Sequence, residues 1–104
     1  MEQRTKTFEE CFVEAINEGL KVLGDSGKQM VFFYLENNYS VKKDEIAKKP
    51  EAFALGLEKI FHAGASVIEK LIVESLYSKL GLKYEEKKEY WFGDYVKKAK
   101  EECK

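Results

Sequence analysis

Residues 65–80 read ASVIEKLIVESLYSKL, and this stretch decides the fold because its apolar side chains recur at helical spacing. The apolar set is Val67, Ile68, Leu71, Ile72, Val73, Leu76, Tyr77 and Leu80. Only the stripe through Lys70, Glu74 and Ser78 is expected to face solvent. A helix with so wide an apolar face must be covered on several sides. We therefore expect residues 65–80 to form the central helix of the domain.

Capping and breaking residues divide the preceding chain into three more helices. Thr7 and Glu10 have the spacing of a capping box, which starts a helix, and Gly24 suits its left-handed exit. Pro50 is placed to open a third helix, where its missing N–H costs nothing, and the break at His62 ends it.

The second helix is expected to run from Ser26 to about residue 38, with a core stripe of Met30, Phe33 and Tyr34 that Val31 and Leu35 widen. Residues 38–49, NYSVKKDEIAKK, then form a connector, with Val41 and Ile46 as apolar anchors and DEIA as a candidate single helical turn. No alternating apolar run or hairpin turn signal suggests a strand.

The C-terminal stretch, residues 83–104, is rich in aromatic side chains: Tyr84, Tyr90, Trp91, Phe92 and Tyr95. A strip at spacing four through Trp91, Tyr95, Ala99 and Cys103 predicts a fifth helix over residues 84–103. The 104 residues are thus expected to form one domain, residues 1–104, with its core in residues 7–82. The predicted fold is an all-α, single compact bundle of about five helices.

Composition limits the function classes. Charged residues make up 36% of the chain, mostly Lys and Glu, and this enrichment favours a thermophilic source. The net charge of −1 gives no general attraction to nucleic acid or membranes. The N-terminus is polar and no apolar run reaches 18 residues, so we expect a cytoplasmic protein without a membrane partner.

Metal, cofactor and catalytic sites are not expected. Cys11 and Cys103 lie far apart and His62 is the single histidine, so the ligand pattern of a zinc site is missing. Two interpretations of the cysteines stay open, namely a disulfide or a buried Cys11 with a free, exposed Cys103. His62 with Glu58 and Glu69 gives no nucleophile–base arrangement. We therefore predict a non-enzymatic protein.

An acidic cluster in the first helix, Glu9, Glu10 and Glu14, offers carboxylates to a metal ion. Charge runs on helices are more often solvated faces, and we favour that interpretation.

Two stretches within residues 23–82 form a recognisable pattern, namely LGDSGKQMVFFYLENNYSV and DEIAKKPEAFALGLEKIFHAGASVIEKLIVESLYSKLGL. This pattern resembles a family of small archaeal helical domains described as presumed output domains of signalling proteins. The shared features are the tyrosine-bearing second helix, the Pro-Glu-x-Phe start of the third, the Phe-x-x-Gly-Ala junction and the Leu-Tyr-x-x-Leu-Gly-Leu exit. The resemblance implies a helical fold, an archaeal source and a regulatory or interaction role, with no catalytic residues to carry over.

Two functional hypotheses follow. Tyr90, Trp91, Phe92 and Tyr95 either dock on the bundle and complete its core, or bind a partner protein or a second copy in a homodimer. The two interpretations are compatible. Our main hypothesis is a protein-interaction or signalling output module.

The alternative is a nucleic-acid-associated accessory protein that uses the basic patch Lys42, Lys43, Lys48 and Lys49. Sequence-specific reading is disfavoured, because the helix after Pro50, EAFALGLEKIF, offers no Arg, Asn or Gln to base edges.

Overall fold

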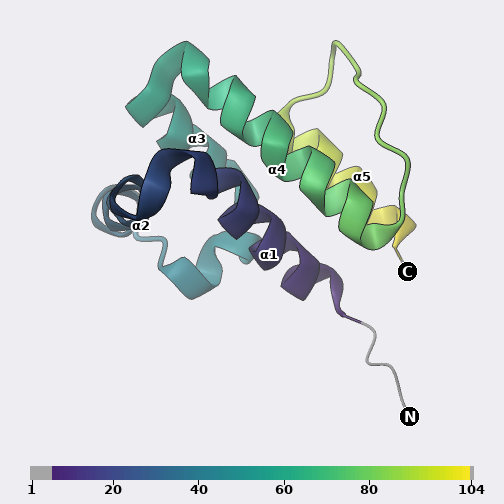
Figure 1. Ribbon diagram of the computed structural model, residues 1–104, viewed down its shortest axis with the longest axis horizontal. Helices are drawn as coiled ribbons and strands as arrows, with labels where there is room; N and C mark the ends of the chain where they lie inside the picture. The colour runs from purple at the N-terminus through teal and green to yellow at the C-terminus, as the bar shows by residue number, and fades with distance from the viewer. Residues whose placement is uncertain (1–5, 104) are drawn as a thin grey trace.

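The computed structural model describes residues 6–103, and the all-α bundle predicted from the sequence is confirmed (Figure 1). The α-helices are α1 (Phe8–Leu20), α2 (Gly24–Tyr39), α3 (Pro50–Phe61), α4 (Ala65–Leu80) and α5 (Phe92–Glu102). Three 3₁₀ turns join the first four: η1 (Lys21–Leu23), η2 (Lys43–Lys48) and η3 (His62–Gly64). Within residues 6–103 there is no β-strand.

The pairing of α1 with α4 organises the core. The two helices run antiparallel: Lys79 pairs with Glu14 at 3.3 Å and with Glu18 at 2.8 Å, while Gly19 faces Ile72, nearer the start of α4. A Cβ at Gly19 would collide with the side chain of Ile72 and lie 3.3 Å from its backbone nitrogen. Glycine is therefore what allows the two backbones to approach so closely.

The central helix, α4, packs against α1, α3 and α5. Its buried residues are Ala65, Ile68, Glu69, Ile72, Val73, Leu76 and Tyr77. The expected apolar face was too wide, because Val67 is 62% exposed and Leu71 is 36% exposed. Successive helical residues are about 100° apart, so the neighbours that cover Ile68 and Ile72 leave Val67 and Leu71 facing outward.

The core stripe predicted for the second helix was right only at its edge. Val31 and Leu35 are buried as expected and Phe32 is buried with them, whereas Met30 is 48% exposed and Phe33 is 70% exposed. The inner face of α2 is fixed by its packing on α3, where Gly56 leaves space for the Leu35 side chain. The sequence pattern contained two overlapping apolar stripes, and this tertiary contact selects between them.

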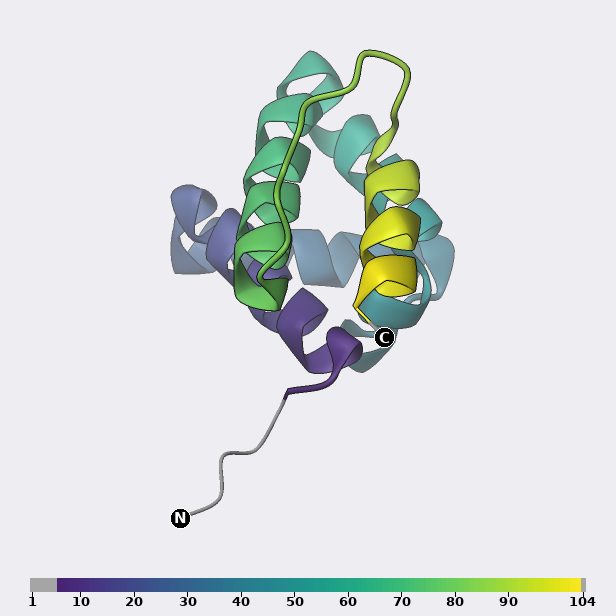
Figure 2. The same ribbon diagram turned by 90° about the vertical axis from the view of Figure 1, so that its right-hand side faces the viewer.

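The C-terminal helix is shorter than predicted, since α5 begins at Phe92 rather than at Tyr84. Gly81 has the left-handed conformation (φ 73°), and the Leu82 N–H donates to the Tyr77 carbonyl at 2.9 Å, which ends α4 as expected. Residues 81–91, which we call the return connector, then run back along α4 (Figures 1 and 2). As a result α5 lies beside α4 and points in the same direction (Figure 2).

Both cysteine thiols are free. Cys11 is buried, which raises the pKa of its thiol, and Cys103 is half-buried. The structure thus contains no disulfide between them, and Cys11 acts as a small apolar core residue.

No helix within residues 6–103 combines the length and the apolar character needed to cross a membrane.

We expect Gly19→Ala to lower the free energy of unfolding by about 1–3 kcal/mol, because the new methyl group has to push Ile72 and α4 away. Gly64→Ala is the matched control. Its Cβ would meet Phe61 at an ordinary 3.8 Å and its φ is −67°, so this variant should be neutral or slightly more stable. Urea denaturation measures the free energy of unfolding of both variants. An equal change in the two variants would contradict the close approach of α1 to α4 at Gly19.

Candidate functional site

A groove of about 470 Å³ lies between the first half of α4, the return connector and the start of α5. Its aromatic lining residues are Tyr84, Tyr90, Trp91, Phe92 and Tyr95, and its charged lining residues are Glu58, Glu69, Lys70, Glu86, Lys87 and Lys88. The structure therefore brings all four aromatic residues of the predicted interaction site into one wall. The volume is within the usual range for small-ligand and side-chain sites.

The four predicted residues are not equally available. Phe92 is buried between Phe12 of α1 and Phe53 of α3, with ring centroids 6.2 Å and 5.9 Å away. Tyr95 is only 9% exposed, whereas Trp91 is 36% exposed. Phe92 and Tyr95 thus complete the core, and Trp91 presents an edge to the groove.

Tyr95 joins the return connector to α5 by hydrogen bonds. Its hydroxyl accepts a hydrogen bond from the Lys87 N–H at 2.7 Å and donates one to the Lys87 carbonyl at 3.1 Å. The Tyr77 hydroxyl donates to the Tyr95 carbonyl at 2.8 Å, which joins α4 to the same residue. The rings of Tyr84 and Tyr90 lie 5.6 Å and 5.0 Å from that of Tyr95. The groove wall is therefore a packed tyrosine cluster rather than a loose loop.

Burial keeps the hydroxyls of Tyr77 and Tyr84 protonated. It raises the pKa of Tyr77 and of Tyr84 to about 12. The Tyr77 hydroxyl therefore stays a hydrogen-bond donor throughout the neutral pH range.

Trp91 precedes α5 instead of lying on its predicted strip. Its backbone N–H donates to the Asp94 carboxylate at 2.9 Å, an interaction typical of the residue before a helix. The Trp91 indole Nε1–H donates to Glu58 of α3 at 3.1 Å. The ring covers Gly93, where a Cβ would lie only 3.1 Å from it. These contacts hold Trp91 at one end of the groove.

Glu69 is the functional candidate that the sequence did not reveal. Its side chain lines the groove from α4 and is only 9% exposed, and its Oε2 atom has no hydrogen-bond partner among residues 6–103. Burial, and secondarily the negative charge of Glu58, raise the pKa of Glu69 to about 7. A sequence signal did exist, because Glu69 occupies the inner stripe of α4 between Ala65 and Ile72. A strongly shifted carboxyl in a groove is typical of a functional site.

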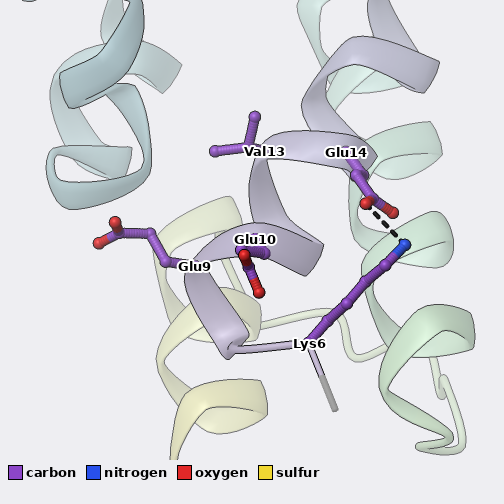
Figure 3. A pocket seen from close by; sticks show the side chains of 5 residues that line it. All are labelled: Lys6, Glu9, Glu10, Val13 and Glu14. Carbon is purple, nitrogen blue, oxygen red and sulfur yellow. Dashed lines mark ion pairs between the residues drawn. The ribbon is translucent and has the colours of Figure 1, made fainter. Parts of the chain in front are cut away.

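The acidic cluster of α1 lies at the surface, where Glu9 and Glu10 are exposed and Glu14 is half-buried, and its side chains line an open pocket (Figure 3). Glu14 pairs with Lys6 at 2.7 Å, and this hydrogen bond lowers the pKa of Glu14. Glu10 accepts from the Thr7 N–H in the predicted capping box, while Glu9 points away from Glu14 (Figure 3). Across residues 6–103, no three His, Cys, Asp or Glu side chains are grouped so as to hold a metal ion.

The four lysines of the predicted basic patch, Lys42, Lys43, Lys48 and Lys49, are exposed around η2. None of them forms an ion pair with a side chain in the described part of the chain. η2 lies on the opposite side of the molecule from the return connector (Figure 1), so the patch and the groove are separate surfaces.

Searches of protein-family models, of curated proteins and of solved structures found no match to this chain.

Tyr95→Phe should lower the free energy of unfolding by about 1–3 kcal/mol, because both hydrogen bonds to the Lys87 backbone are lost. The Lys87 amide should also exchange faster with solvent, which hydrogen-exchange NMR measures. Tyr39→Phe is the control, since its hydroxyl makes no hydrogen bond within residues 6–103. Unchanged Lys87 exchange would show that Tyr95 does not fasten the connector.

Glu69 should make stability fall as the pH rises. Its pKa is about 7 in the folded chain against an ordinary 4.5, so the folded state retains a proton that the unfolded state loses. The stabilisation is fully present below pH 4.5 and is lost by about pH 7, a change of about 3 kcal/mol. Comparison with Glu69→Gln in urea titrations at several pH values isolates this effect. The exposed Glu74→Gln control should keep the wild-type slope.

Proposed function

We propose that this chain is a non-catalytic, cytoplasmic protein-binding module that takes a segment of a partner protein into the groove between α4 and the return connector. The observation that carries the proposal is the groove itself, which is open at its surface yet has a wall fastened by Tyr95. A wall that is already ordered loses little entropy when a partner binds.

The chemistry of the lining supports the same proposal. Trp91 and Tyr90 offer large, rigid surfaces with few rotatable bonds, and such residues dominate binding energy at protein interfaces. Val67 adds an exposed apolar side chain at the edge. The resemblance of residues 23–82 to presumed archaeal output domains favours a signalling role for the interaction. A second copy of the chain is an alternative occupant, which would give a homodimer.

Val67→Trp should fill the groove and reduce capture of the partner by about tenfold or more, equivalent to about 1.4 kcal/mol. Val22→Trp is the matched control, because Val22 is 64% exposed against 62% for Val67 and lies outside the groove. Tagged wild type and both variants are incubated with nuclease-treated lysate of the source organism, and captured proteins are quantified by mass spectrometry.

Three outcomes separate the alternatives. Loss of a specific protein with Val67→Trp alone supports the module. Equal capture by all three forms contradicts a role for the groove. A wild-type dimer in light scattering that Val67→Trp converts to a monomer assigns the groove to self-association.

Nucleic acid binding is the second candidate, favoured by one observation: the four lysines around η2 are exposed and free of ion pairs within residues 6–103. Their replacement by Glu should then abolish binding to duplex DNA or RNA at low salt, because phosphate contacts supply the affinity. Fluorescence polarisation measures this effect. Unchanged binding, or none in the wild type, removes the candidate.

A further inference from the structure

The orphaned carboxylate of Glu69 indicates what the groove binds. A buried oxygen without a hydrogen bond to another protein group is rare in folded proteins, and Glu69 Oε2 is such an atom within residues 6–103. Its charged neighbour in α3, Glu58, is also acidic and already accepts the Trp91 indole N–H. The groove is therefore lined by two neighbouring carboxylates, and neither forms an ion pair within residues 6–103.

The lysines that line the groove are engaged elsewhere or lie in solvent. Lys70 pairs with Glu86 at 3.5 Å. Lys87 is 3.8 Å from Glu85, and its Nζ atom lies 5.8 Å from the centre of the Tyr90 ring. Lys88 is exposed. No ion pair joins any of them to Glu69 within residues 6–103, so a positive charge to pair with the ionised Glu69 would have to come from another molecule.

We propose that the groove binds an alkylammonium group, namely the side chain of a lysine presented by the partner protein, with Glu69 and Glu58 as its counter-ions. This inference rests on the proposed protein-binding function and specifies the chemistry of the bound segment. An ammonium group brings three N–H donors and a positive charge, which are what an unpartnered carboxylate requires.

The remaining lining suits the rest of a lysine side chain. Val67 and Val73 offer apolar contacts for the aliphatic stem. Trp91 and Tyr90 offer aromatic faces, which attract ammonium groups. The Tyr90 ring already lies close to two ammonium groups of this chain, since the Nζ atoms of Lys87 and Lys98 are 5.8 Å and 6.0 Å from its ring centre.

The proposal makes binding depend on pH. The groups that line the groove together with Glu69 are Glu58 of α3, Lys70 of its own helix, Tyr84, Glu86, Lys87, Lys88 and Tyr90 of the return connector, and the uncharged Phe92 and Tyr95 of α5. With a pKa of about 7, Glu69 is about one-tenth ionised at pH 6 and about nine-tenths ionised at pH 8. Affinity for a cation that requires the ionised form should therefore be about tenfold weaker at pH 6.

The test uses Trp91, the single tryptophan of the chain, whose fluorescence reports directly on the groove. The full chain is titrated at pH 8 and pH 6 with n-butylammonium chloride, which reproduces a lysine side chain. The uncharged n-butanol is the matched control ligand. The same titrations use Glu69→Gln, which keeps the shape of the side chain, and Glu74→Gln, which lies outside the groove. Circular dichroism verifies that each variant is folded.

The expected result is saturable binding of n-butylammonium at pH 8, weaker by about tenfold at pH 6 and in Glu69→Gln, and unchanged in Glu74→Gln. A fluorescence change that is equal for n-butanol, or equal in Glu69→Gln, overturns the proposal. In that event the Val67→Trp capture experiment still decides the proposed function, so the two failures are distinguishable.

A second comparison identifies the source of the ammonium group. The peptide acetyl-Gly-Lys-Gly-amide should bind at least as tightly as n-butylammonium and lose binding when Lys is replaced by norleucine. Spermidine binding that exceeds the peptide's by about tenfold overturns the assignment to a protein lysine and makes the ligand a free polyamine.

Discussion

Gly19 lets α1 lie so close to α4 that the side chain of Ile72 occupies the space of the missing Cβ. α3 and α5 also pack on α4, and α2 packs on α3. With α1 on one side of α4, α3 and α5 cover other parts of its circumference, and Phe92 of α5 reaches between Phe12 and Phe53. The close packing of α1 on α4 thus depends on Gly19, a residue without a side chain.

The groove exists because α5 lies parallel to α4. Two consecutive parallel helices cannot be joined by a tight turn, so the chain has to travel the length of α4 before α5 begins. That return path places the connector over α4 and creates the groove between them. A connector of this length would normally be costly to order. The two hydrogen bonds between Tyr95 and Lys87, together with the packed tyrosine rings, offset that cost.

Local chemistry predicted several helix ends. The capping box of Thr7 and Glu10, Pro50 at the start of α3 and Gly81 at the end of α4 were all recognised, because each depends on neighbours within one turn. The start of α2 was not, since the helix begins at Gly24 rather than at Ser26. The inner face of α2 was predicted only at Val31 and Leu35, since Gly56 on another helix selects it. The start of α5 was placed too early, because aromatic residues at helical spacing also occur in the return connector.

The candidate site was predicted only in part. Tyr90, Trp91, Phe92 and Tyr95 were recognised from their density in the sequence, and all four line the groove. Glu69 was missed although it lies on the inner stripe of α4, because its place on that stripe does not show how deeply the carboxyl is covered. Its burial depends on the return connector and α5, whose positions no local pattern specifies.

The groove is built almost entirely from one contiguous stretch of chain, residues 66–95, with Glu58 as its single member from outside. Its contacts are therefore of low contact order, and this unit can open without separating α1 from α4. Releasing the return connector breaks the Lys70–Glu86 pair, the Tyr95–Lys87 hydrogen bonds and the Trp91–Glu58 hydrogen bond, while Phe92 keeps α5 in place. The return connector can thus open locally while α1 and α4 stay paired.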